Sequence, residues 1–297
     1  MRADDRNLSR EQRALVEERA LALLHRADAW GRIPVPVEDV LDAAKLKVAP
    51  HSIFDPSAIK EYAKSQGAKA ASLIKKALGK IFGVLDAADE VIHIDDTVTP
   101  GKQMFLKLHE TGHHELPHQR KIFRFFEESS KELDPDIADL FEREANNFAS
   151  FVMFNGSTFQ ERAADHELSF NSVKRLQRSF KVSLYAALRE YTRTHRRTCF
   201  AVCCECPKFC PDQGYACEVR RVEVSPSFEV RFELPVSNRI SGKQALAPLV
   251  PFGRKATRPT EISLRDKNGE VHQFIGEALD TTFNILIFCC LSADFKR

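Results

Sequence analysis

Residues 109–113 read His-Glu-Thr-Gly-His, and this His-Glu-x-x-His spacing constrains the chain more than any other feature. On a helix, residues four apart lie on the same face, so His109 and His113 can present two imidazole nitrogens to one zinc ion. Glu110 lies beside the first ligand, close enough to take a proton from a zinc-bound water. The pattern therefore predicts a helix that carries two zinc ligands and the general base of a hydrolase.

The flanking residues predict where this helix begins and ends. Thr99 suits the N-cap, Pro100 suits the first helical position, and Pro117 ends the run. Gly112 weakens the helix slightly but permits close packing beside the metal. A second His-Glu-x-x-His, at residues 114–118, has proline at its fourth position, so we do not expect its two histidines to share a helical face.

A catalytic zinc site needs a third protein ligand, with the fourth position left to water. A helix is expected over residues 134–153, because Asp134 followed by proline is a typical helix start. Its apolar stripe consists of Ile137, Phe141, Ala145, Phe148 and Val152. Glu144 borders this stripe, whereas Glu142 points well away from Phe148, and a carboxylate on an apolar face needs a partner. We expect Glu144 to be the third ligand; the alternative is that it pairs with an arginine or caps another element.

Two segments, HETGHHELP and EREANNFASFVM, resemble the ImmA/IrrE family of metallopeptidases. The resemblance covers roughly residues 10–200 and is specific in these two motifs, the second of which contains the Glu-Ala-Asn-x-Phe-Ala of the family. It implies that His109, His113 and Glu144 bind Zn²⁺ and that Glu110 is the general base.

The resemblance also implies a function. Family members of this kind are zinc endopeptidases that cleave a helix-turn-helix transcriptional repressor in response to DNA damage or a related stress, and so derepress phage, mobile-element or defence genes. The expected partners are that repressor and an activating signal such as single-stranded DNA. The alternative, from a different class, is a DNA-binding transcriptional regulator whose zinc is structural or vestigial and which does not cleave protein.

Composition agrees with a globular intracellular enzyme. A chain of 297 residues with 43% apolar content can bury a substantial core and suggests two domains. The charged N-terminus lacks the apolar stretch of a signal peptide, and the apolar run at residues 283–291 is too short to span a membrane. We expect a cytoplasmic protein without membrane contact, and the net charge of +2 says little about its partners.

The predicted fold class is α+β, with a zinc peptidase domain at residues 1–158. Before the histidine helix, we expect helices at residues 9–29, 37–46 and 57–65, an ambiguous segment at 72–78, and a hairpin of strands 81–85 and 91–94.

A helix-turn-helix-like unit is expected at residues 159–197, packed on the peptidase domain. Ser169 and Ser183 can each cap a short helix, and the connection between the two helices is tight. Residues 174–197 carry eight Lys or Arg and one acid. Such an excess could contact nucleic acid, with Lys174, Arg175, Arg178 and Arg193 as the candidates; the competing interpretation is a set of solvated helix faces.

Residues 198–297 are predicted to form a mainly stranded C-terminal domain, which by resemblance would be a GAF-like sensory domain. The expected strands are residues 199–204, 228–234, 261–264, 271–275 and 283–291.

The eight cysteines allow two interpretations. Those at residues 199–204 and 289–290 fit buried strands, where free cysteine behaves as a small hydrophobe. Cys206, Cys210 and Cys217 lie near prolines and a glycine and suggest a loop. Together with Cys203 they could form a structural zinc site. Alternatively, one thiolate of Cys206, Cys210 or Cys217 could occupy the open position of the catalytic zinc and inhibit the peptidase.

Overall fold

The computed structural model describes residues 7–49, 83–86, 90–95, 97–122, 134–210, 214–236, 238–242 and 244–295. The helix expected at residues 57–65 and the ambiguous segment at residues 72–78 lie outside these ranges. The chain divides into two compact units, with the boundary between Gly156 and Ser157. Both units mix helix and sheet, as the α+β prediction required.

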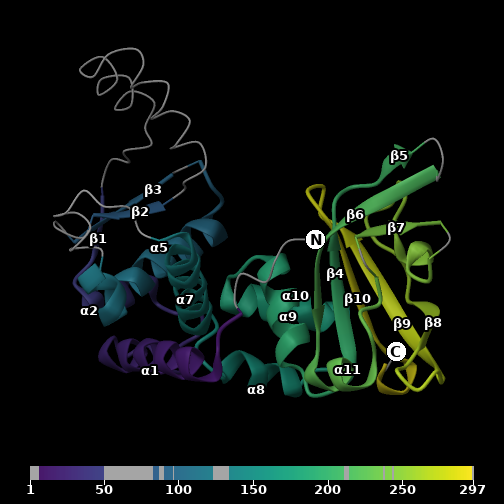
Figure 1. Ribbon diagram of the computed structural model, residues 1–297, viewed down its shortest axis with the longest axis horizontal. Helices are drawn as coiled ribbons and strands as arrows, with labels where there is room; N and C mark the ends of the chain where they lie inside the picture. The colour runs from purple at the N-terminus through teal and green to yellow at the C-terminus, as the bar shows by residue number, and fades with distance from the viewer. Residues whose placement is uncertain are drawn as a thin grey trace, which may run out of the picture. The chain divides into compact units, whose positions relative to one another are not determined.

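Besides a small sheet, the described part of the N-terminal unit contains four labelled helices and a further helical segment at residues 117–122 (Figure 1). The helices are α1 (Arg10–Arg26), α2 (Val37–Ala44), α5 (Pro100–Glu115) and α7 (Pro135–Met153), and the strands are β1 (Lys47–Val48), β2 (Gly83–Asp86) and β3 (Val91–Ile94). The strand order is β1-β3-β2, in which β3 is parallel to β1 and antiparallel to β2. The expected hairpin before the histidine helix is therefore confirmed.

Helices α5 and α7 begin where the sequence predicted. Thr99 and Pro100 occupy the N-cap and first position of α5, and the Asp134 side chain caps α7 by accepting a hydrogen bond from the Asp136 amide. The two helices pack closely at Gly112. A Cβ atom at that glycine would lie 3.2 Å from the Cα of Ala145, so only glycine allows this approach without a shift. The approach brings the histidine face of α5 next to α7.

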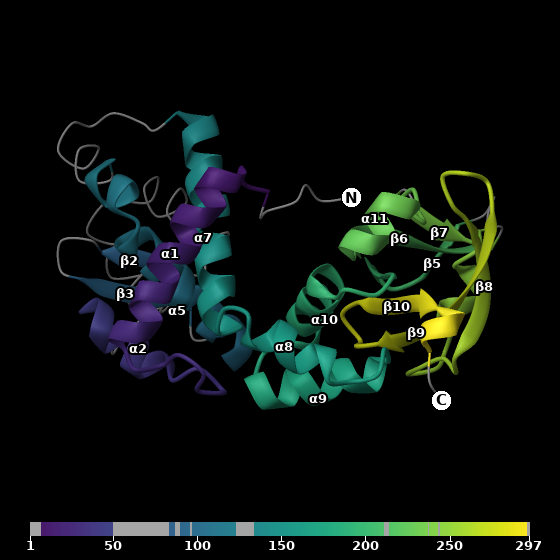
Figure 2. The ribbon, with the colours of Figure 1, turned by 90° about the horizontal axis from the view of Figure 1, so that it is seen from below.

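The C-terminal unit begins with three short helices, α8 (Thr158–Ala164), α9 (Phe170–Phe180) and α10 (Leu184–Thr194). The sequence analysis placed residues 159–197 in a separate unit on the peptidase domain, but the structure groups them with the sheet that follows. The reason is packing of α10 on the sheet. The ring centroids of Tyr191 and Phe288 lie 5.7 Å apart, and Nε of buried Arg189 lies 2.5 Å from Oε1 of Glu223. In Figure 2 these helices lie along one side of the sheet.

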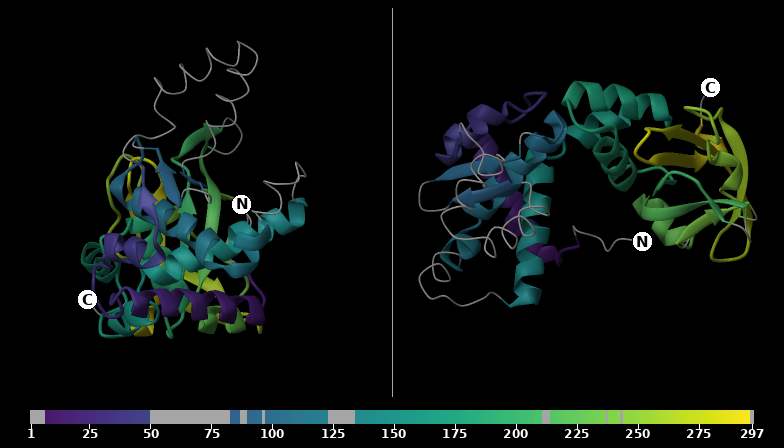
Figure 3. Two further views of the ribbon diagram at one scale, coloured as in Figure 1. Left: turned by 90° about the vertical axis from the view of Figure 1, so that its left-hand side faces the viewer. Right: turned by 90° about the horizontal axis from the view of Figure 1, so that it is seen from above.

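A seven-stranded, curled antiparallel sheet forms the rest of this unit (Figure 3). Its order is β5-β6-β4-β10-β9-β8, and β7 also pairs with β6. The strands are β4 (Cys199–Cys204), β5 (Lys208–Cys210), β6 (Gly214–Val224), β7 (Arg239–Ser241), β8 (Thr260–Arg265), β9 (Val271–Asp280) and β10 (Ile285–Leu291).

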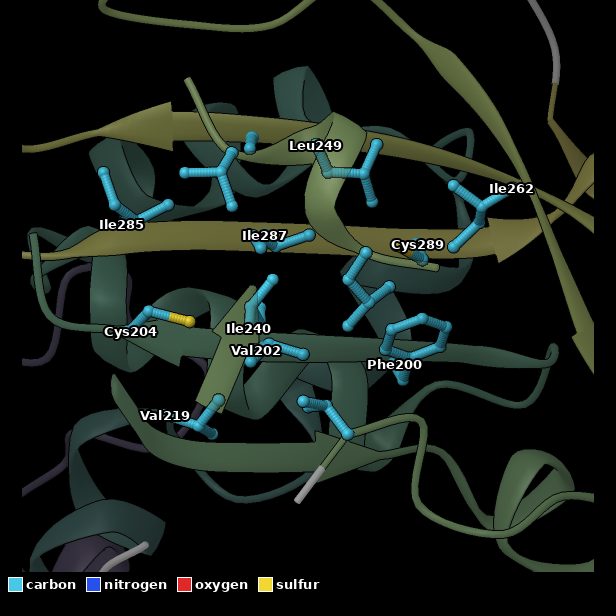
Figure 4. Packing of buried hydrophobic residues seen from close by; sticks show 14 of the residues in the cluster. Phe200, Val202, Cys204, Val219, Ile240, Leu249, Ile262, Ile285, Ile287 and Cys289 are labelled. Carbon is cyan, nitrogen blue, oxygen red and sulfur yellow. The ribbon is translucent and has the colours of Figure 1, made fainter. Parts of the chain in front are cut away.

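A cluster of buried hydrophobic residues packs on one face of the sheet and includes Phe200, Val202, Ile287 and Leu249 (Figure 4). The cysteines of β4 and β10 are buried strand residues, as predicted. The prediction of a strand at residues 228–234 is wrong. Ser225 caps a helix there, α11 (Pro226–Arg231), by accepting a hydrogen bond from the Phe228 amide.

None of the helices within the described ranges has the length and apolar character needed to cross a membrane.

Candidate metal centre

Three side chains from α5 and α7 converge at one point of the N-terminal unit. The Nε2 atoms of His109 and His113 lie 3.1 Å apart. The two carboxylate oxygens of Glu142 lie 3.3 Å from Nε2 of His109 and 3.6 Å from Nε2 of His113. Both histidines are buried, whereas the Glu142 side chain is 61% exposed. The three side chains form a group that can hold a metal ion, and Glu142 lies on its solvent-exposed side.

Glu144, the third ligand expected from the sequence, is not a member of this group. Its side chain is buried and turned toward a second pair of residues, His118 and Gln119. The Nε2 atoms of both lie 2.6 Å from Oε2 of Glu144. The expectation was therefore wrong about which carboxylate of α7 joins the two histidines, and Glu142 takes the place assigned to Glu144.

The observed distances fit a zinc ion. Zinc ligands at about 2.0–2.1 Å in a tetrahedron lie roughly 3.3 Å from one another. The three separations between Nε2 of His109, Nε2 of His113 and the carboxylate of Glu142 fall on either side of this value. Two imidazoles and one carboxylate are also a donor set typical of catalytic zinc, in which a fourth position stays open. These residues would hold the ion.

Glu110 lies within the same site. It is 7% exposed, and burial raises the pKa of its carboxyl group against the opposing effect of His109 and His113. The carboxylate accepts a hydrogen bond from the backbone N–H of Leu85 in β2, so the sheet fixes its position. A raised pKa suits a general base, because the group then holds a proton more readily during catalysis.

The charges of the ligand group are mutually stabilising. Hydrogen bonds from His109 and then His113 hold the pKa of Glu142 well below its usual range. For His113, burial acts to lower the pKa, but the hydrogen bond to Glu142 and the charge of Glu110 outweigh it and raise the pKa. An ionised Glu142 carboxylate beside two imidazole nitrogens is a donor set suited to a cation.

The predicted cysteine ligands receive no support from their own surroundings. Cys217 is fully buried in the core of the C-terminal sheet, and this burial raises the pKa of its thiol to about 11. The Cys206 thiol donates to the carbonyl of Thr282 at 3.4 Å. The side chain of Cys210 lies outside the described part of the chain. No candidate metal group found among the described residues contains a cysteine.

The other candidate metal group of the described residues is a structural turn. Asp266, Glu270 and His272 meet at the connection between β8 and β9. Oδ1 of Asp266 accepts hydrogen bonds from the backbone amides of Asn268 and Glu270, and Oδ2 lies 3.0 Å from the His272 ring. Because these bonds already use both oxygens, the group is explained by turn geometry.

The basic residues predicted to contact nucleic acid are only partly available. Arg193 pairs with Glu190 at 2.6 Å, and the Lys174 ammonium lies over the Phe170 ring. Arg175 and Arg178 are exposed on α9. Helix α10 would be the recognition helix of a helix-turn-helix, yet none of its residues is exposed. A recognition helix must enter the major groove, so α10 does not fit that role.

Fold and site together define a metallopeptidase-like protein with two histidines and a glutamate around one metal position. The family model Peptidase_M78, described as the IrrE N-terminal-like domain, matches residues 72–191. Residues 72–191 therefore form an IrrE N-terminal-like domain, which supports the resemblance to the ImmA/IrrE family of metallopeptidases that the two motifs predicted. The match runs from the N-terminal unit to α10, so the family domain includes residues on both sides of the unit boundary.

Among solved structures, the chain is similar to a Mycobacterium tuberculosis transcriptional regulator. The TM-score is 0.51 at 12% sequence identity, and the alignment covers 95% of this chain and 80% of the regulator. At this identity the similarity shows a shared fold that extends over both units. No curated protein sequence matches the chain.

Proposed function

We propose that this protein is a zinc-dependent endopeptidase. The convergence of His109, His113 and Glu142 beside buried Glu110 is the observation that carries the proposal. When bound, zinc would supply Lewis-acid chemistry, which polarises a peptide carbonyl and makes water a stronger nucleophile. Glu110 accepts the proton of the attacking water on its carboxylate and passes it to the leaving amine.

Burial of three of these side chains supports hydrolysis rather than simple metal storage. His109, Glu110 and His113 are each less than 9% exposed, so their interactions are little screened by water. Glu142, at the exposed side, leaves the site accessible from solvent. This arrangement gives a peptide access to the general base while α5 and α7 hold that base in place.

The proposed substrate is a helix-turn-helix transcriptional repressor, cleaved in response to DNA damage or a related stress. This part rests on the family resemblance, and the regulator-like fold supports a role in transcriptional control. Cleavage would derepress phage, mobile-element or defence genes in the cytoplasm. The activator would be single-stranded DNA or another damage signal that acts on the exposed basic residues or the C-terminal sheet.

The test uses the full chain, co-expressed with candidate repressors under DNA-damaging conditions. Glu110→Gln should abolish repressor cleavage and leave the zinc content unchanged, because it removes the base but no ligand. Glu115→Gln is the matched control, since Glu115 is on the same helix but pairs with Arg26. Retained cleavage in Glu110→Gln would contradict the proposal.

The alternative, a DNA-binding regulator with structural zinc, has one observation in its favour: Arg175 and Arg178 are exposed on α9. It predicts normal gene control in Glu110→Gln and loss of control in the Arg175→Ala/Arg178→Ala double variant. The endopeptidase proposal predicts the reverse order of sensitivity when expression of the repressor's target gene is measured with a reporter.

A further inference from the structure

A second row of side chains lies behind the metal centre. Glu144 is 3% exposed and Gln119 is fully buried. The Gln119 amide bridges two groups: its Nε2 atom donates to Glu144 at 2.6 Å, and its Oε1 atom lies 2.6 Å from Nδ1 of His113. The chain of contacts therefore runs from Glu144 through Gln119 to a histidine of the metal centre.

The chemistry of the end groups sets the direction of these hydrogen bonds. A carboxylate accepts and does not donate, and the same is true of the Phe141 carbonyl, which lies 3.3 Å from Nε2 of Gln119. The amide NH₂ of Gln119 must therefore face these two acceptors. Its carbonyl oxygen then faces His113, and this requires a hydrogen on Nδ1. In a neutral imidazole, Nε2 keeps its lone pair.

We propose that Glu144 and Gln119 are positioning residues that hold His113 in the tautomer able to bind metal through Nε2. The inference rests on the proposed function, because it concerns the same metal centre. Nε2 of His113 is the atom that faces His109 and Glu142, so the tautomer with hydrogen on Nδ1 is the one the site needs. His118, which contacts the same oxygen of Glu144, anchors the far end of the row.

Exchanging the two polar groups tests the direction. In Glu144→Gln, the new amide can donate to Oε1 of Gln119, which allows the bridge to reverse and leaves the hydrogen on Nε2 of His113. In Gln119→Glu, two carboxylates lie side by side and repel. In the double exchange, a carboxylate accepts from Nδ1 of His113 and an amide donates to that carboxylate, so the original direction returns.

The readout is zinc affinity of the full-length protein, measured by competition with a chromophoric chelator. We expect each single variant to bind zinc roughly 10- to 100-fold more weakly than the wild type, the range found for such outer contacts. The double variant should return to within about threefold of the wild type. Glu115→Gln, a control whose side chain pairs with Arg26 and not with the row, should bind like the wild type.

Two results would overturn the inference: a Glu144→Gln variant with wild-type affinity, or a double variant as weak as the singles. A packing defect would not be reversed by the exchange, so recovery separates positioning from mere structural support. These failures differ from failure of the proposed function. In that case the wild type itself would bind no zinc, or Glu110→Gln would still cleave.

Discussion

His195 should make the stability of the C-terminal unit sensitive to mild acid. The residue follows α10 and is 7% exposed. Burial, and then the charge of Arg197, lower its pKa to about 4, against a smaller opposing effect of Asp294. Its Nδ1 atom accepts a hydrogen bond from the backbone amide of Arg197 at 3.1 Å, and the Tyr191 ring packs beside it. Because Nδ1 accepts this hydrogen bond, the ring is neutral in the folded protein.

The magnitude follows from the two pKa values. In the unfolded chain His195 titrates near its ordinary value of 6.5, and in the folded chain near 4. At about 1.4 kcal/mol per unit, this difference is worth roughly 3 kcal/mol. Between these pH values the unfolded state binds the extra proton, so stability falls as the pH drops from 6.5 toward 4. Above pH 6.5 the stabilisation is fully present.

The assay is urea unfolding of the full chain at several pH values between 7.5 and 4.5, beside His195→Asn. The asparagine oxygen can accept the same backbone hydrogen bond but does not titrate. The free energy of unfolding of the wild type should fall more steeply, with a difference of about 2–3 kcal/mol between the ends of the range. Equal pH dependence in the two proteins would refute the reasoning.

Two further substitutions each test side-chain packing within one of the two units. Arg189→Met should lower the free energy of unfolding by up to about 3 kcal/mol, because it leaves the half-buried carboxylate of Glu223 with only the more distant Arg221. Exposed Arg178→Met is the control, and equal losses in urea unfolding would contradict this. Gly156→Ala should cost roughly 1–3 kcal/mol, because φ is +61° there and a Cβ atom would lie 2.6 Å from the Trp30 ring. An unchanged melting temperature in Gly156→Ala would count against the assigned backbone conformation.

Local signals in the sequence predicted the helices that build the site. Proline at the first position set the start of α5, and the side chains of Asp134, Ser169 and Ser183 cap α7, α9 and α10 as expected. Each of these signals acts within three or four residues, so no knowledge of tertiary packing is needed. The same is true of the spacing that brings His109 and His113 together.

The choice between Glu142 and Glu144 needed long-range information. The apolar stripe of α7 predicts that the carboxylate nearest to it needs the metal as a partner. That carboxylate instead contacts His118 and Gln119, which follow the end of α5. The carboxylate that lies with the two histidines is the more exposed Glu142, one helical turn from the Ala145 that packs on Gly112. A catalytic metal site must be open to its substrate, so exposure of the carboxylate favours Glu142 over buried Glu144.

The C-terminal unit was predicted less completely for the same reason. Strands β4, β8, β9 and β10 have apolar or alternating patterns that show in the sequence. The long strand β6 was missed because charged residues interrupt it, although Arg221 within it is buried. Its place is set by pairing with β4, a contact that no local pattern reveals.

The most direct test of the account is the position of zinc in crystals of the full-length protein, located by anomalous scattering at the zinc edge. The account predicts one ion bound by Nε2 of His109, Nε2 of His113 and the carboxylate of Glu142, with Glu144 in contact with Gln119. An ion bound by Glu144 instead, or zinc absent from the two histidines, would contradict it.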